Sequence, residues 1–111
     1  MRIEDLQVNA REASVLLKAM SNERRLMILC HLARGEKSVG QLEELVSLSQ
    51  SALSQHLARL RRDRLVRTRR NAQSIYYSLN GTQAVAVMSA LGSLYPPAPS
   101  RVAAGAVSAL A

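Results

Sequence analysis

The fold is decided by residues 50–62, which read Gln-Ser-Ala-Leu-Ser-Gln-His-Leu-Ala-Arg-Leu-Arg-Arg. Leu53, Leu57 and Leu60 recur at the spacing of one helical face, so this face is predicted to pack on a core. The outward positions of the first half carry hydroxyls and amides, at Gln50, Ser51, Ser54 and Gln55. The polar face of an ordinary surface helix is more often rich in Glu and Lys, whereas this stretch contains no acid.

A second short helix is predicted immediately before this one. Ser38 and Gln41 have the spacing of a capping box, which begins a helix that runs to Val46. Ser49 can cap the helix at 50–62, so only a few residues separate the two helices. Two short helices joined this closely are typical of a helix-turn-helix.

Two further helices are predicted upstream, from apolar residues at helical spacing. The first runs from about residue 5 to residue 19. Ser21 or Asn22 can cap the second, which Gly35 ends.

A hairpin and a last helix are predicted downstream. Residues 65–69 and 74–79 are rich in β-branched and aromatic residues and flank a polar tip at 70–73, which is typical of a β-hairpin. Residues 82–95 then form a helix that is apolar over much of its circumference, and we expect it to pack with the first helix across a two-fold dimer axis.

The predicted fold class is therefore mainly α with a small β-hairpin. The order is four helices, two strands and a helix, which is a winged helix-turn-helix that dimerises through its first and last helices. Residues 1–95 are predicted to form one DNA-binding and dimerisation domain. Residues 96–111, rich in Pro and Ala, are predicted to be a poorly ordered tail.

The charge indicates a polyanionic partner, either nucleic acid or an anionic membrane surface. The formal net charge is +7. Seven arginines gather in one run, at Arg59, Arg61, Arg62, Arg64, Arg67, Arg69 and Arg70. A basic cluster can also be a plain solvated face. The neighbouring helix-turn-helix favours double-stranded DNA.

The residue types on the helix at 50–62 suit a major groove. Small hydroxyls allow close approach, and an amide such as Gln55 can pair with adenine. Arg59 at the basic end is predicted to contact phosphates, which orient a protein without reading sequence. The hairpin tip adds Arg69, Arg70 and Gln73, which can follow the backbone or enter a minor groove.

Residues 16–79 resemble the ArsR family of winged-helix repressors. The strings 17–26, Leu-Lys-Ala-Met-Ser-Asn-Glu-Arg-Arg-Leu, and 48–57, Leu-Ser-Gln-Ser-Ala-Leu-Ser-Gln-His-Leu, are similar to the branch that holds HlyU, BigR, SqrR and NolR. The resemblance implies a homodimer that binds an imperfect palindrome at a promoter and usually represses. It also implies groove contacts for Gln50, Ser51, Ser54, Gln55 and His56, and a phosphate contact for Arg25. Relatives often carry Gly where this chain has Arg64, so we expect that turn to be slightly strained or changed.

The signal that this protein senses is less evident. No cysteine lies in 39–46 and no His or carboxylate in 82–95, where the family places its usual metal ligands, so a metal sensor is not expected. The resemblance implies a switch of two cysteines, but only Cys30 is present and Pro96 stands where the second would be. Cys30 is either core packing or a single-thiol sensor of reactive sulfur or oxygen species. A small-molecule effector is also left open.

Other classes of function are less well supported. No nucleophile–base pair, phosphate loop or metal set predicts an enzyme or a cofactor. No stretch is apolar enough to span a membrane, and no signal peptide is evident, so the expected location is the cytoplasm. The alternative is a winged-helix adaptor that binds proteins instead of specific DNA. An adaptor would not need the polar and then basic face of residues 50–62.

Overall fold

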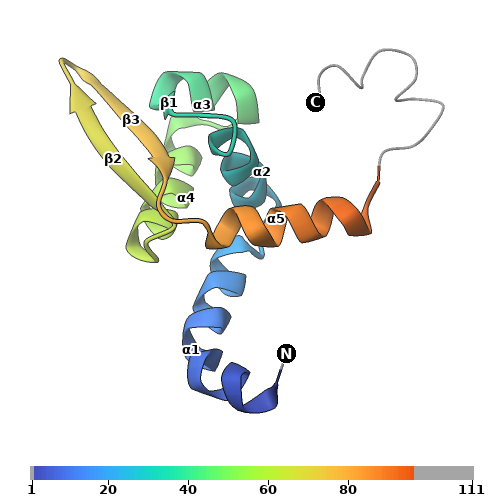
Figure 1. Cartoon of the computed structure of the whole chain (residues 1–111). Helices are drawn as coiled ribbons and strands as arrows, with labels where there is room; N and C mark the ends of the chain where they lie inside the picture. Colours follow the sequence, from blue (N-terminus) through green and yellow to red (C-terminus); the bar gives the residue numbers. More distant parts are fainter. Residues whose placement is uncertain (1, 97–111) are drawn as a thin grey trace.

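The computed structural model describes residues 2–96, and it confirms a winged helix-turn-helix (Figure 1). The elements in chain order are α1 (Ile3–Met20), α2 (Glu23–Leu32), β1 (Lys37–Ser38), α3 (Val39–Val46), α4 (Gln50–Arg62), β2 (Val66–Asn71), β3 (Ser74–Leu79) and α5 (Gln83–Leu94). Helices α2, α3 and α4 form the body, from which α1, α5 and the β2–β3 wing extend in different directions (Figure 1). Apart from Pro96, the predicted tail at 96–111 lies outside the described residues.

The predicted hairpin is present within a three-stranded antiparallel sheet of order β1-β3-β2. Strand β1 was not predicted, because two residues are too short to show an alternating pattern. It forms because Lys37 and Ser38 pair with Tyr77 and Tyr76 of β3. Strand β2 also continues further than predicted, since Arg70 pairs with Ile75. Arg70 therefore lies in the strand and not in the tip loop.

The predicted starts of α2, α3 and α4 are confirmed by their side-chain caps. Ser38 and Gln41 form a complete capping box, and the Ser49 side chain accepts a hydrogen bond from the backbone of Ala52. Of the two candidates for α2, Asn22 is the cap. Helix α2 ends at Leu32 and not at Gly35, which follows in a turn with φ +139°.

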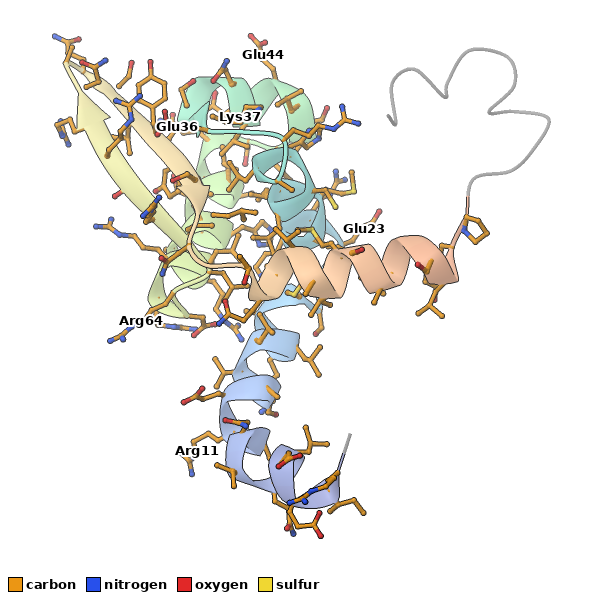
Figure 2. All side chains as sticks on the ribbon, viewed as in Figure 1. Arg11, Glu23, Glu36, Lys37, Glu44 and Arg64 are labelled. Carbon is orange, nitrogen blue, oxygen red and sulfur yellow. The ribbon has the colours of Figure 1, made fainter. Side chains whose placement is uncertain are left out.

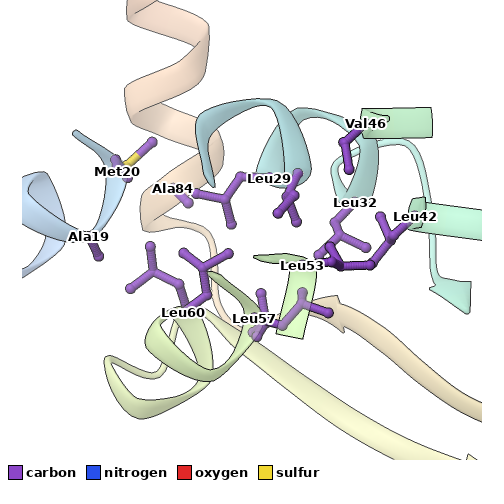
Figure 3. Close-up of a cluster of buried hydrophobic side chains, with 13 residues drawn as sticks. Ala19, Met20, Leu29, Leu32, Leu42, Val46, Leu53, Leu57, Leu60 and Ala84 are labelled. Carbon is purple, nitrogen blue, oxygen red and sulfur yellow. The ribbon is translucent and has the colours of Figure 1, made fainter. Parts of the chain in front are cut away.

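The core is entirely aliphatic apart from one Met, and α4 supplies its centre (Figure 3). Leu53, Leu57 and Leu60 are almost completely buried, as their spacing predicted. Opposite them lie buried residues of α2, α3, the wing base and α5, namely Ile28, Leu29, Leu32, Leu42, Val46, Leu65, Val66 and Ala84. The buried face of α4 fixes which residues of that helix face solvent.

Helix α4 ends in a Schellman motif built on an arginine. The Leu65 amide donates to the Leu60 carbonyl at 2.9 Å, and the Arg64 amide donates to the Arg61 carbonyl at 3.0 Å. This pattern requires a left-handed residue at its centre, and Arg64 has φ +63°. The expected strain at Arg64 is therefore present, because an L side chain adopts this region at a cost of roughly 1–2 kcal/mol.

Helices α1 and α5 expose apolar side chains that nothing within residues 2–96 covers. Val8 on α1 is 84% exposed, and Leu94 on α5 is 69% exposed. The other exposed large apolar residues of these elements are Ile3, Leu6, Val15, Leu17, Val85 and the following Tyr95. Contiguous exposed apolar surface on a small protein is typical of an interaction site.

Replacing Arg64 with Gly is expected to stabilise the protein, because Gly adopts a positive φ without the steric penalty of a Cβ. The expected gain in the free energy of unfolding is about 0.5–1 kcal/mol, measured by urea denaturation. Arg62→Gly, two residues earlier in the regular helix, is the matched control and is expected to lose a similar amount. Equal destabilisation of the two variants would contradict the Schellman assignment.

Candidate DNA-binding surface

The exposed face of α4 carries four of the predicted groove-contacting residues. Gln50, Ser51, Ser54 and Gln55 are all exposed. Because Leu53, Leu57 and Leu60 occupy the opposite, buried face, the polar residues are held in fixed positions relative to the core. Helix α4 contains no acidic residue, so this surface offers only hydrogen-bonding groups and positive charge.

A groove runs between α4 and the wing. Gln50, Ser54 and Ala58 form one wall, and Ile75 and Tyr77 of β3 form the other. Arg61 and Arg62 lie at the end of the same groove. The sequence prediction names the basic end of this helix in general and does not select these two arginines. They follow Ser54 by seven and eight positions, so helical spacing places them on the same side of α4 as Ser54.

His56 and Arg59 are less exposed than the polar face of α4, although Arg59 follows Gln55 by four residues and so lies one turn along the same side of the helix. Both are half-buried, and Arg59 Nε lies 2.8 Å from Asp63 Oδ2. Burial, together with the positive charges of Arg25 and Arg24, lowers the pKa of His56 below its ordinary value of 6.5. His56 is therefore held neutral near pH 7, and its contact with DNA, like that of Arg59, stays a prediction.

Arg25 is engaged in holding helices together. Its Nε donates to the Ala19 carbonyl at 2.6 Å and its Nη2 to the Lys18 carbonyl at 3.3 Å, which caps the end of α1. Burial, followed by the charge of Arg59, lowers the pKa of Arg25. The neighbouring Arg24 caps α3 in the same way, through the Val46 carbonyl. A phosphate contact by Arg25 is untested.

The wing residues fall into two groups. Arg70 and Gln73 are exposed toward the end of the hairpin. Arg69 forms a bidentate ion pair with Glu36, with both N···O distances 2.7 Å. The three residues are thus close in sequence, but Arg69 already has an anionic partner within the chain.

Cys30 is half-buried between α2 and α5. Its Sγ lies 3.5 Å from Met88 Sδ, and burial raises the pKa of the thiol above its ordinary value. The thiolate is the reactive form of cysteine, so this environment disfavours reaction. The geometry favours the packing interpretation, while a single-thiol response stays a prediction.

Across residues 2–96, no three side chains of His, Cys, Asp or Glu come together as a metal site. In the same part of the chain, no helix has the length and apolarity needed to cross a bilayer.

Comparison with known proteins gives the family of this fold and surface. Residues 22–68, which include α2, α3, α4 and the start of the wing, match the model of the bacterial regulatory proteins of the arsR family. The transcriptional activator HlyU of Vibrio cholerae is 54% identical over 95 residues, which cover 86% of this chain and 88% of HlyU. The chain belongs to the ArsR family.

Two other relatives support this assignment. The nodulation protein NolR of Rhizobium meliloti is 48% identical over 78% of this chain and 71% of its own length. The crystal structure of the transcriptional repressor BigR from Xylella fastidiosa matches this chain with a TM-score of 0.84 and 40% sequence identity, covering 88% of this chain and all of the BigR chain. The predicted resemblance to the branch holding HlyU, NolR and BigR is confirmed.

The lowered pKa of His56 predicts how stability depends on pH. Between the lowered pKa and 6.5, the unfolded chain binds more protons than the folded chain, so the free energy of unfolding decreases as pH falls through this range. This stability is fully present above pH 6.5. The His56→Gln variant is expected to show a smaller decrease when urea denaturation is compared at pH 7.5 and pH 5. A decrease as large as that of the unmutated protein would contradict the assignment.

Proposed function

We propose that this ArsR-family transcription regulator acts as a homodimeric repressor that binds a palindromic promoter site. The observation that carries the proposal is the exposed face of α4, which is polar, free of acid and bordered by Arg61 and Arg62 in a groove against the wing. Hydroxyls and amides at the start of the helix suit base edges, and arginines at its end suit phosphates. The protein-binding adaptor is less favoured, because a protein partner does not require this division.

The base contacts are assigned to Gln50, Ser51, Ser54 and Gln55. Their side chains are exposed on one surface, so they can enter a major groove together. Backbone contacts are assigned to Arg61 and Arg62 beside them, and to Arg70 and Gln73 of the wing. No acid of α4 opposes the approach of a phosphate.

Dimerisation is supported by the uncovered apolar residues of α1 and α5. A second copy related by a two-fold axis would cover the same surface on both chains. Such a dimer would present two α4 helices, and two-fold symmetry in the protein calls for two-fold symmetry in the DNA site. The palindrome therefore follows from the proposed dimer.

Repression is the simplest consequence of occupying a promoter, since a dimer on the site competes with polymerase. The relatives include both kinds of regulator, since HlyU is named a transcriptional activator and BigR a transcriptional repressor. In vitro transcription from the gene's own upstream region tests this choice. Added protein is expected to lower transcript yield, while a rise in yield would make the protein an activator.

Binding itself is tested by titrating the protein against a fluorescent fragment of that upstream region, with competitor DNA present. Gln55→Ala is expected to lower specific affinity by about 1–3 kcal/mol, because a bidentate contact to a base is lost, and to leave non-specific binding unchanged. Gln41→Ala, outside the proposed interface at the start of α3, is the matched amide control. An equal loss on specific and competitor DNA would refute base reading by Gln55.

The dimer is tested by analytical ultracentrifugation of the unmutated protein and of Leu94→Glu. The unmutated protein is expected at twice the mass of one chain. Leu94 is 69% exposed, so the charge is tolerated in one chain but is unfavourable in the proposed interface. The dimer Kd is expected to rise at least about a hundredfold, because the two-fold axis places Leu94 of both chains in the interface and each loses its apolar burial. Leu45→Glu makes the same exchange on α3 and is expected to leave the dimer intact; equal behaviour of both variants would place the interface elsewhere.

A further inference from the structure

One ion pair of the wing crosses the whole sheet. Nε and Nη2 of Arg69, on β2, each donate a hydrogen bond to one carboxylate oxygen of Glu36, and both N···O distances are 2.7 Å. The same guanidinium lies over the Tyr76 ring of β3, with its central carbon 4.5 Å from the ring centre. Glu36, labelled in Figure 2, immediately precedes β1. The Arg69 side chain therefore connects the outer strand β2, the central strand β3 and the start of β1.

The pleat of the sheet places this contact on the face that points away from α4. Arg69 pairs with Tyr76, and Arg70 pairs with Ile75. Neighbouring residues of a strand point to opposite faces. Ile75 and Tyr77 line the groove against α4, so Arg70 shares the face of the groove and Arg69 lies on the other face.

The charges of this contact are already compensated. The hydrogen bond between the two side chains lowers the pKa of Glu36 and raises that of Arg69, and the charge of Arg67 lowers the pKa of Glu36 further. A phosphate would have to displace a carboxylate that fits the guanidinium fork in the geometry that Arg prefers. In contrast, no salt bridge within residues 2–96 involves Arg70.

We propose that Arg69 is a positioning residue, whose bridge to Glu36 across Tyr76 holds the wing so that Arg70 meets the DNA backbone. This proposal rests on the proposed function, because it assumes that the wing contacts DNA. It replaces the prediction that Arg69 itself binds DNA. It also gives Glu36 an unexpected role, since an acid on a basic surface here supports DNA binding.

Glu36→Gln distinguishes phosphate binding by Arg69 from positioning of the wing by Arg69, because the two roles predict opposite changes in DNA affinity. If Arg69 bound phosphate, removal of the competing acid would tighten DNA binding and steepen its salt dependence. If Arg69 positions the wing, loss of the ion pair weakens binding, and we expect a two- to fivefold higher Kd, roughly the effect of one exposed ion pair. Glu44→Gln, on α3 in Figure 2, makes the same change of charge and measures the purely electrostatic effect.

Hydrogen exchange of the free protein tests the bridge without DNA. Backbone amides of β2 and β3 are expected to exchange about two- to fivefold faster in Glu36→Gln, and also in Arg69→Lys, because Lys cannot form the bidentate pair. They are expected to be unchanged in Glu44→Gln. Unchanged exchange in the first two variants, or tighter DNA binding by Glu36→Gln, would overturn the proposal. Absence of specific binding by the unmutated protein would count against the proposed function, while faster exchange would still support the bridge.

Discussion

The structure depends on one constraint, the burial of the leucine face of α4. A chain of 111 residues without Phe or Trp must build its core from small aliphatic side chains, and Leu53, Leu57 and Leu60 lie at its centre. Full burial of one such side chain contributes about 1.5–3 kcal/mol. The same packing that stabilises the domain sets the rotation of α4 about its axis. The exposed polar face of the helix is therefore held in place by the core.

The arginines divide into two groups by the partners that they have within the chain. Arg24 and Arg25 cap the ends of α3 and α1, and Arg59 pairs with Asp63. The carbonyl partners of Arg24 and Arg25 lie at helix C-termini, where they would otherwise lack helical donors. Arg61, Arg62 and Arg70 lie on the groove or on its side of the wing, and of these Arg62 Nε also lies 3.8 Å from Asp63 Oδ1. A strongly basic sequence thus contains fewer arginines available to DNA than its net charge suggests.

Much of the fold could be predicted because its signals are local. The capping box at Ser38, the caps of α2 and α4 and the periodicity of the leucines each depend on residues within one or two turns. The strain at Arg64 was expected from the resemblance to relatives that often carry Gly there, and its positive φ agrees with that expectation. Strand β1 was missed, since it exists only through its pairing with residues about 40 positions away. The exposed polar face of α4 was predicted for the same local reason as its leucines.

By itself the sequence determined the order of the elements, the buried face of α4 and the polar residues opposite it, because helical spacing alone assigns residues to faces. Only the tertiary structure decided which arginine of the wing faces the groove. Arg69 and Arg70 are adjacent and chemically identical, yet the pleat places them on opposite faces and Glu36 reaches only one. That selection depends on strand register and on an ion pair between residues 33 positions apart, neither of which is visible in local spacing.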